Sequence, residues 1–136
     1  MEIPQESVLL RIFIGEKERC EHQPLYEALV MKAREMHLGG ATVLRGVLGY
    51  GKSSRVHTAK ILQLSMDLPV VVEIVDSREK IESFFPFLDE MMDGGLVTVE
   101  RAQVVHYRHK TGKRSDATPP IEESAASEIS TTDFHE

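Results

Sequence analysis

The sequence predicts an α+β domain of the ferredoxin-like type, a βαββαβ sandwich with a four-stranded antiparallel sheet. Three observations predict it. Residues 8–14 alternate apolar side chains with a period of two, residues 24–36 repeat them at helical spacing, and a similar succession of strand and helix returns between residues 68 and 107. Right-handed crossovers in this topology place both helices on one face of the sheet.

The first half of the domain continues from its strand into a helix and a second strand. Pro24 suits the first helical turn, because that position needs no backbone N–H. Apolar residues follow at helical spacing as far as Met36, and the Gly39-Gly40 pair supplies the stop. Residues 41–48 are expected to form the second strand, and a long loop comes after it.

The second half begins with residues 68–75, a continuous and β-branched run that is typical of a buried strand. Asp76 and Glu79 form a capping-box pattern for a second helix, which Pro86 should interrupt and kink. Residues 96–107 are expected to form the last strand.

Length and composition fit a single domain. The chain has 136 residues, of which 41% are hydrophobic, and it holds one cysteine. No run of eighteen apolar residues and no signal-peptide pattern is present, and a lone Cys20 fits a reducing cytosol, so we expect a cytoplasmic protein. The formal charge of −6 argues against nucleic acid as a partner.

Domain boundaries follow from a change of composition. Residues 1–109 are expected to form the domain, and residues 110–136, rich in Ser, Thr and acids, a disordered tail. A docking peptide around residues 129–134 is the alternative interpretation of the tail. Several strands are apolar on both sides, so we expect a second copy of the chain to cover the sheet face opposite the helices. On that sheet Glu73 needs a partner, which Arg11 or Arg45 could supply.

The loop after the second strand carries the strongest functional signal. Residues 36–66 contain no Asp or Glu but hold several bases and glycines. Glycine amides and basic side chains together favour a phosphate site, and a merely solvated loop is the alternative. Residues 46–53 also match the P-loop pattern G-x-x-x-x-G-K-[ST]. A P-loop NTPase needs a parallel sheet, however, and the predicted order of elements argues against one.

Three segments of the chain resemble the family known as domain of unknown function 190, whose fold is similar to that of the PII signalling proteins. They are PLYEALVMKAREMHLGGATVLRGVLGYGKSS, DLPVVVEIVDSREKI and GGLVT. The resemblance covers roughly residues 7–109. It implies a homotrimer whose sheets face inward, adenine nucleotides bound in clefts between subunits, and a long loop that contacts partners.

The resemblance also assigns binding residues by position. A Gly-aromatic-Gly-base pattern falls on Gly49, Tyr50, Gly51 and Lys52, which would cradle phosphates. The Asp-Gly turn before the last strand falls on Asp93 and Gly94, with Gly95 where PII proteins usually have a lysine. Arg108 is implied to reach a phosphate from a neighbouring subunit, while His106 is either a titratable substitute for a second arginine or a polar strand end.

The partner-binding loop is implied to begin directly after Lys52. Its polar and basic residues are Ser53, Ser54, Arg55, His57, Thr58 and Lys60. It contains no tyrosine, so the tyrosine modification of some PII proteins has no acceptor here. Relatives are often encoded beside a fluoride channel, which implies a membrane transporter or ion channel as partner.

Catalysis finds little support in the sequence. Cys20, Ser53, Ser54 and Thr58 are the candidate nucleophiles, and none sits in a recognisable pattern with a base. No metal-ligand spacing is present, so we expect neither metal nor cofactor. The sequence therefore predicts a PII-like nucleotide sensor that is not an enzyme and that favours AMP or ADP, because Gly95 removes a cation. The alternatives are a scaffold trimer without nucleotide and a P-loop NTPase.

Overall fold

A computed structural model describes residues 2–51, 57–58 and 67–108 of the chain. Its main feature is a four-stranded sheet in which every pair of neighbouring strands is antiparallel. Across the sheet the strands are β4 (Thr42–Arg45), β7 (Pro69–Asp76), β1 (Glu6–Gly15) and β8 (Leu96–Gln103). This order, with β1 and β7 in the centre, confirms the ferredoxin-like arrangement.

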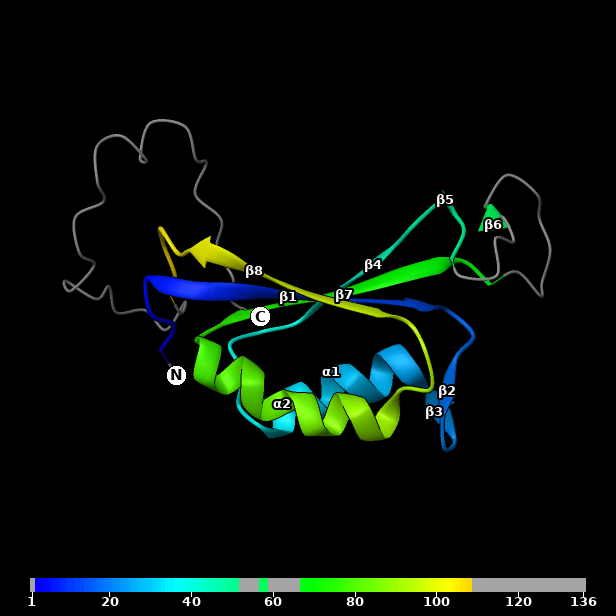
Figure 1. Ribbon diagram of the computed structural model, residues 1–136, viewed down its shortest axis with the longest axis horizontal. Helices are drawn as coiled ribbons and strands as arrows, with labels where there is room; N and C mark the ends of the chain where they lie inside the picture. Colours follow the sequence, from blue (N-terminus) through cyan, green and yellow to red (C-terminus); the bar gives the residue numbers. More distant parts are fainter. Residues whose placement is uncertain (1, 52–56, 59–66, 109–136) are drawn as a thin grey trace.

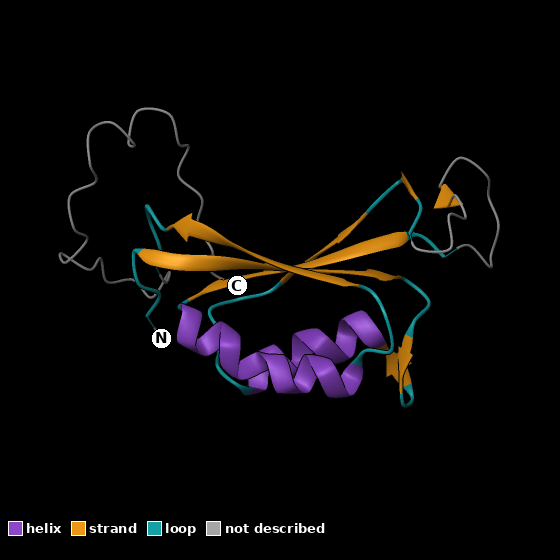
Figure 2. Cartoon of the chain, in the orientation of Figure 1, coloured by secondary structure: helices purple, strands orange, loops and turns teal. Residues whose placement is uncertain are grey.

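Two helices cover one face of the sheet, and no helix among the described residues lies on the other face (Figure 1, Figure 2). They are α1 (Leu25–Glu35) and α2 (Arg78–Met91), which lie side by side beneath the strands. Two short hairpins complete the described elements. Residues Arg19–Cys20 (β2) pair with Gln23–Pro24 (β3), and Leu48–Gly49 (β5) pair with His57–Thr58 (β6).

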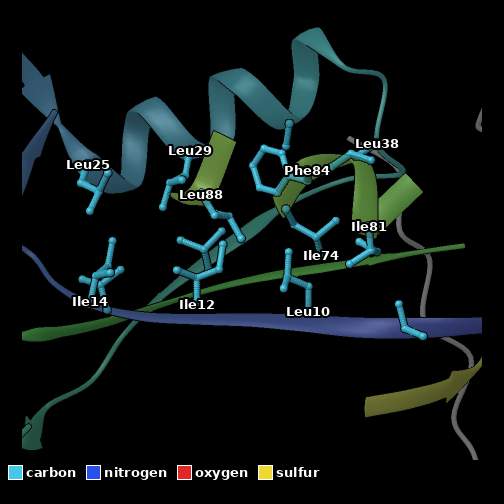
Figure 3. Packing of buried hydrophobic residues seen from close by; sticks show 14 residues of the cluster. Leu10, Ile12, Ile14, Leu25, Leu29, Leu38, Ile74, Ile81, Phe84 and Leu88 are labelled. Carbon is cyan, nitrogen blue, oxygen red and sulfur yellow. The ribbon is translucent and has the colours of Figure 1, made fainter. Parts of the chain in front are cut away.

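The hydrophobic core lies between this sheet and the two helices. Because side chains alternate along a strand, every second residue of β1 points to the helices, and Leu10 and Ile12 are fully buried there. Leu29 of α1 and Phe84 of α2 meet them from the helical layer (Figure 3). Burial of one such side chain stabilises the fold by about 2 kcal/mol, so this layer holds the sheet and helices together.

Helix α1 ends earlier than the sequence predicts, and not at the glycine pair. His37 takes the left-handed conformation with φ of 61°. The N–H of His37 donates to the carbonyl of Arg34, and the N–H of Leu38 donates to the carbonyl of Ala33, each over 3.0 Å. These two bonds form a Schellman motif, which satisfies the last carbonyls of the helix. His37 therefore ends the helix, a role that we expected the Gly39-Gly40 pair to have.

The predicted second strand, residues 41–48, is divided in two. Strand β4 pairs with β7 as far as Arg45, which lies opposite Val70. The chain then leaves the sheet, and β5 pairs with β6 instead. The division places the start of the long loop away from the sheet surface.

Helix α2 and strand β8 also differ from the prediction at their ends. The N-cap of α2 is Ser77, whose Oγ accepts a hydrogen bond from the N–H of Lys80, so Asp76 is not the cap. Pro86 lies inside the helix and does not interrupt it. Strand β8 ends at Gln103 rather than at residue 107.

The sheet face opposite the helices, here called the open face, is apolar around a charged centre. The apolar members include Leu9, Phe13, Val71 and Val75, which alternate with the core residues of β1 and β7. In the centre Arg11 donates from Nε to Glu73 over 3.1 Å and from Nη1 to Glu100 over 3.2 Å. The expected partner of Glu73 is therefore Arg11.

Candidate functional site

The root of the long loop lies where β4 ends and β7 begins. The N–H of Gly46 donates to the carbonyl of Pro69 over 2.7 Å. A Cβ added to Gly46 or to Gly49 would lie 2.9 or 3.1 Å from Cγ of Pro69. The backbone packs directly against the proline ring, so a side chain at Gly46 would force a shift and one at Gly49 would make a tight contact.

The predicted phosphate cradle begins in this root. Gly49 pairs with His57 across the β5–β6 hairpin, the side chain of Tyr50 is 70% exposed, and nothing lies within 4 Å of a Cβ placed on Gly51. The Gly49–Gly51 backbone is thus accessible to a ligand. Of the other residues assigned to the cradle and the partner loop, His57 and Thr58 are described as backbone of β6. Outside the described residues lie Lys52, Ser53, Ser54, Arg55 and Lys60.

The β1–β2 turn holds both ends of the long loop, which the sequence analysis did not predict. At one end Nη2 of Arg45 donates to Oε2 of Glu16 over 2.5 Å. At the other, the N–H of Lys17 donates to Oδ1 of Asp67 over 2.8 Å. Gly15 makes room for that carboxylate, since its Cβ would lie 2.7 Å from Oδ2 of Asp67. These pairs are far apart in sequence, so no local pattern could indicate them.

The turn between α2 and β8 contains Asp93, Gly94 and Gly95, all exposed. Gly95 has φ of 112°, and its Cβ would lie 2.8 Å from the carbonyl oxygen of Phe13. Both the conformation and the close approach therefore require glycine.

A pocket of about 430 Å³ borders this turn, which is within the size range of small-molecule sites. The turn shares the lining with residues that are mainly apolar, namely Phe85, Leu88, Asp89, Met92, Val97 and Val99. Asp89 and Asp93 are the ionisable side chains among these lining residues. The pocket itself suits an uncharged ring better than a phosphate.

Arg108 lies at the other end of the sheet and follows Tyr107, which interacts with the buried carboxylate of Asp76. Asp76 is fully buried and accepts hydrogen bonds from the N–H of Gly39 over 2.8 Å and of Ser77 over 2.6 Å. The hydroxyl of Tyr107 donates to the carbonyl of Gly39 over 3.2 Å. Burial, and to a lesser extent the charge of Asp76, raise the pKa of Tyr107 above 10.0. Nε of Arg108 is buried without a hydrogen-bond partner among the described residues.

The predicted site residues therefore fall into three groups. The Gly49–Gly51 root and the Asp93–Gly95 turn share one end of the sheet but belong to its opposite edges, β4 and β8. Three strand spacings separate these edges, or about 14 Å. Arg108 is removed from both by the length of β8, about 26 Å for its strand residues. One copy of the chain does not bring the three groups into a single site.

The antiparallel sheet argues against the P-loop alternative. The strand before residues 46–53 is β4, which pairs antiparallel with β7, whereas P-loop enzymes carry the motif on a parallel sheet. Among the described residues, no three His, Cys, Asp or Glu side chains are grouped as metal ligands. None of the described helices has the length and apolar character needed to cross a bilayer.

Comparison with known proteins gives the chain its family. Residues 7–104 match the family model DUF190, described as "Uncharacterized ACR, COG1993". A UPF0166 protein of Aquifex aeolicus is 45% identical over 100 residues, covering 72% of this chain and 92% of that protein. A UPF0166 protein of Methanocaldococcus jannaschii is 32% identical over 100 residues, covering 73% of this chain and 92% of that protein.

The fold has a counterpart among solved structures. CPII, a nitrogen regulatory PII-like protein from Thiomonas intermedia K12 with ADP, AMP and bicarbonate bound, aligns with a TM-score of 0.51 and 17% identity. The alignment covers 73% of this chain and 88% of CPII. At this identity the likeness concerns the fold, which is PII-like. Because the family model spans most of the sequence and a relative is 45% identical, the chain belongs to the DUF190 family.

Proposed function

We propose that the chain is a PII-like regulatory protein that binds AMP or ADP in clefts between copies of itself. The observation that carries the proposal is the division of the candidate site. A glycine-rich root at the β4 edge and a glycine turn with a pocket at the β8 edge lie at one end of the same sheet. CPII, which has a similar fold, was solved with both nucleotides.

The cover of the open face is a second part of the proposal. An apolar face that includes Phe13 and Val71 needs a partner, and identical copies are the simplest one. In a closed ring whose sheets face inward, the β8 edge of each copy lies beside the β4 edge of the next. A homotrimer of this kind brings the Asp93–Gly95 turn of one copy to the Gly49–Gly51 root of another.

The chemistry of the two half-sites fits the two halves of a nucleotide. Exposed backbone at Gly49–Gly51 offers N–H groups to phosphate oxygens, and the apolar pocket beside Gly95 suits a purine ring. Lys52, and Arg108 from a neighbouring copy, would supply the positive charge. Gly95 supplies no positive charge, which favours a nucleotide with one or two phosphates over a triphosphate.

The output of the proposed sensor is control of a partner. Nucleotide binding would order residues 52–67 and so shift the population that engages the partner. The partner we propose is a membrane transporter or ion channel, contacted by a cytoplasmic trimer. No cofactor beyond the nucleotide ligand enters this scheme.

Isothermal titration calorimetry of the full chain with AMP, ADP, ATP and cyclic di-AMP tests the proposal. We expect saturable heat with AMP or ADP, at micromolar to millimolar concentration, and a weaker response to ATP. Absence of heat with every one of the four nucleotides would sink the proposal. Free phosphate, measured in the ATP titration with Mg²⁺, checks the hydrolase alternative, which requires its release.

The double variant Lys52→Ala, Arg108→Ala separates a sensor from a scaffold. If the chain is a sensor, the double variant loses most of its nucleotide affinity, because two phosphate contacts are removed. If the chain is a scaffold, the double variant binds its partner as the unmodified chain does. The double variant Arg34→Ala, Arg78→Ala is the matched control, since it removes equal charge from the exposed helical surface. Equal affinity in both double variants would contradict the assigned contacts.

A further inference from the structure

Arg45 is a base at the root of the loop that the assigned site does not use. It is the last residue of β4 and comes four residues before Gly49. Its side chain is 57% exposed, and a single hydrogen bond, from Nη2 to Glu16, is its one recorded contact of that kind among the described residues. A guanidinium carries five donors in a planar fork, so most of them are available to another anion.

Glu16 is fixed in place where it meets this guanidinium. The backbone N–H of Glu16 donates to the carbonyl of Leu68 over 2.8 Å, and its side chain is only 24% exposed. Arg45 belongs to residues 36–51, a stretch without a carboxylate of its own. The β1–β2 turn thus places a carboxylate directly against the guanidinium of Arg45.

The backbone of Arg45 is held equally well. Its pairing with Val70 ends the β4–β7 ladder, and the next residue, Gly46, is bonded to the carbonyl of Pro69. The Arg45–Glu16 pair therefore joins two fixed backbones through one exposed and one partly buried side chain. Because the guanidinium itself is exposed to solvent, the ion pair contributes little free energy, so another anion can replace Glu16 at small cost.

We propose that Arg45 is an additional phosphate-binding residue and that Glu16 is its internal competitor. The inference rests on the proposed function, since the phosphate is that of the bound nucleotide. When ADP enters, the guanidinium exchanges the Glu16 carboxylate for phosphate oxygens. A terminal phosphate carries more charge than a carboxylate and accepts two parallel bonds from arginine, so the exchange favours the ligand.

Glu16 also affects the nucleotide concentration at which the site fills. While Glu16 occupies the guanidinium, an arriving phosphate meets a carboxylate as well as a base, which weakens its binding. A singly charged anion gains little from the exchange, whereas a phosphate with two charges gains more. The pair accordingly raises the concentration of nucleotide at which the site fills and favours ligands with a terminal phosphate.

Calorimetry with ADP on the full chain and on Glu16→Gln, Arg45→Gln and the double variant tests this inference. We expect Glu16→Gln to bind ADP about threefold more tightly, as the loss of a competitor for an exposed guanidinium permits. Arg45→Gln should bind about tenfold more weakly, because a charge-assisted bond is lost. In the double variant Glu16→Gln should have no further effect, since the two residues act through one contact.

An exposed ion pair on α2 provides the controls. Arg78 and Glu82 lie 3.7 Å apart, and Arg78 is about as exposed as Arg45, so Glu82→Gln and Arg78→Gln make the same charge changes away from the loop root. These variants should bind ADP as the unmodified chain does, and circular dichroism checks that all variants fold. Unchanged affinity in Arg45→Gln and Glu16→Gln overturns this inference alone. If the unmodified chain binds no ADP, the proposed function falls and this inference with it.

Discussion

Two adjacent glycines in the α2–β8 turn have different physical roles. Gly95 has a positive φ and approaches the carbonyl of Phe13, so an added methyl group meets both backbone strain and a fixed oxygen. Gly94 is not among the positive-φ glycines of the described residues, and a Cβ there meets nothing within 4 Å. The turn therefore depends on one of its two glycines.

We predict that Gly95→Ala lowers the free energy of unfolding by about 2 kcal/mol, because the strain and the contact add. Gly94→Ala should change it by less than about 0.5 kcal/mol. Urea unfolding at one fixed protein concentration, followed by circular dichroism, measures both variants. Equal losses would show that the turn rearranges around a methyl group at either position.

Some of these residues stood out in the sequence and others did not. Gly49, Gly94 and Gly95 stood out through their resemblance to a PII pattern, although of the two turn glycines only Gly95 has a backbone that requires glycine. His37 and Ser77 did not, because any of several residues can end or cap a helix, and the chain offered a glycine pair and an aspartate nearby. Asp76 is buried and bonded to Gly39, a long-range contact that no local spacing reveals.

At the scale of elements, the segment after β8 is tied across the end of the sheet. The N–H of Val104 donates to the carbonyl of Gln5 over 2.7 Å, and the hydroxyl of Tyr107 donates to the carbonyl of Gly39. This segment carries Arg108, so the two contacts fix the backbone from which the side chain of Arg108 extends.

The raised pKa of Tyr107 makes the tie sensitive to alkaline pH. The folded chain holds the phenol neutral, with its pKa above the ordinary 10.0, so this contribution to stability is complete below pH 10. It is lost as the pH rises from 10 through the folded pKa. We expect Tyr107→Phe to lose about 1 kcal/mol at neutral pH and to show a smaller further loss above pH 10.

Thermal unfolding between pH 8 and pH 11 measures this effect. Tyr50→Phe is the control, because it removes a hydroxyl from a side chain that is 70% exposed. If Tyr107→Phe and the unmodified chain lose stability in parallel above pH 10, the phenol is not responsible.

The type and order of the four sheet strands and the two helices followed from periodicity, because the alternation in β1 and the helical spacing in α1 and α2 are strong. The β2–β3 and β5–β6 hairpins were not predicted, and Pro24, expected in the first helical turn, lies in β3. The ends of the elements did not follow from periodicity either. The break between β4 and β5 arises because Gly46 turns onto Pro69, more than twenty residues away, and the end of β8 depends on Gln5. Likewise the Arg45–Glu16 pair joins the end of β4 to the β1–β2 turn, which only the folded sheet brings together.

At the scale of the whole molecule, residues of the open face can be changed separately from those of the core. Assembly and core stability can therefore be tested independently. Val71 lies on that face in β7, while its neighbours Val70 and Val72 are buried in the core. A change at Val71 therefore acts on the surface through which copies are proposed to meet.

We predict that Val71→Asp reduces the particle to a monomer, because three added carboxylates would be buried together in the trimer. Met31→Asp, on the helical side with 50% exposure, is the matched control and should retain the mass of three chains. Light scattering after size-exclusion chromatography gives both masses. A monomeric unmodified chain would contradict the proposed assembly.

The two outer strands of the sheet, β4 and β8, each have one side without a strand partner among the described residues. A single copy therefore exposes two strand edges that can pair with the backbone of other chains, and it also exposes the apolar open face. If neighbours cover these borders, folding and association become linked by mass action. Dilution would then lower the melting temperature, and a sparsely expressed chain would be more vulnerable to proteases than an abundant one.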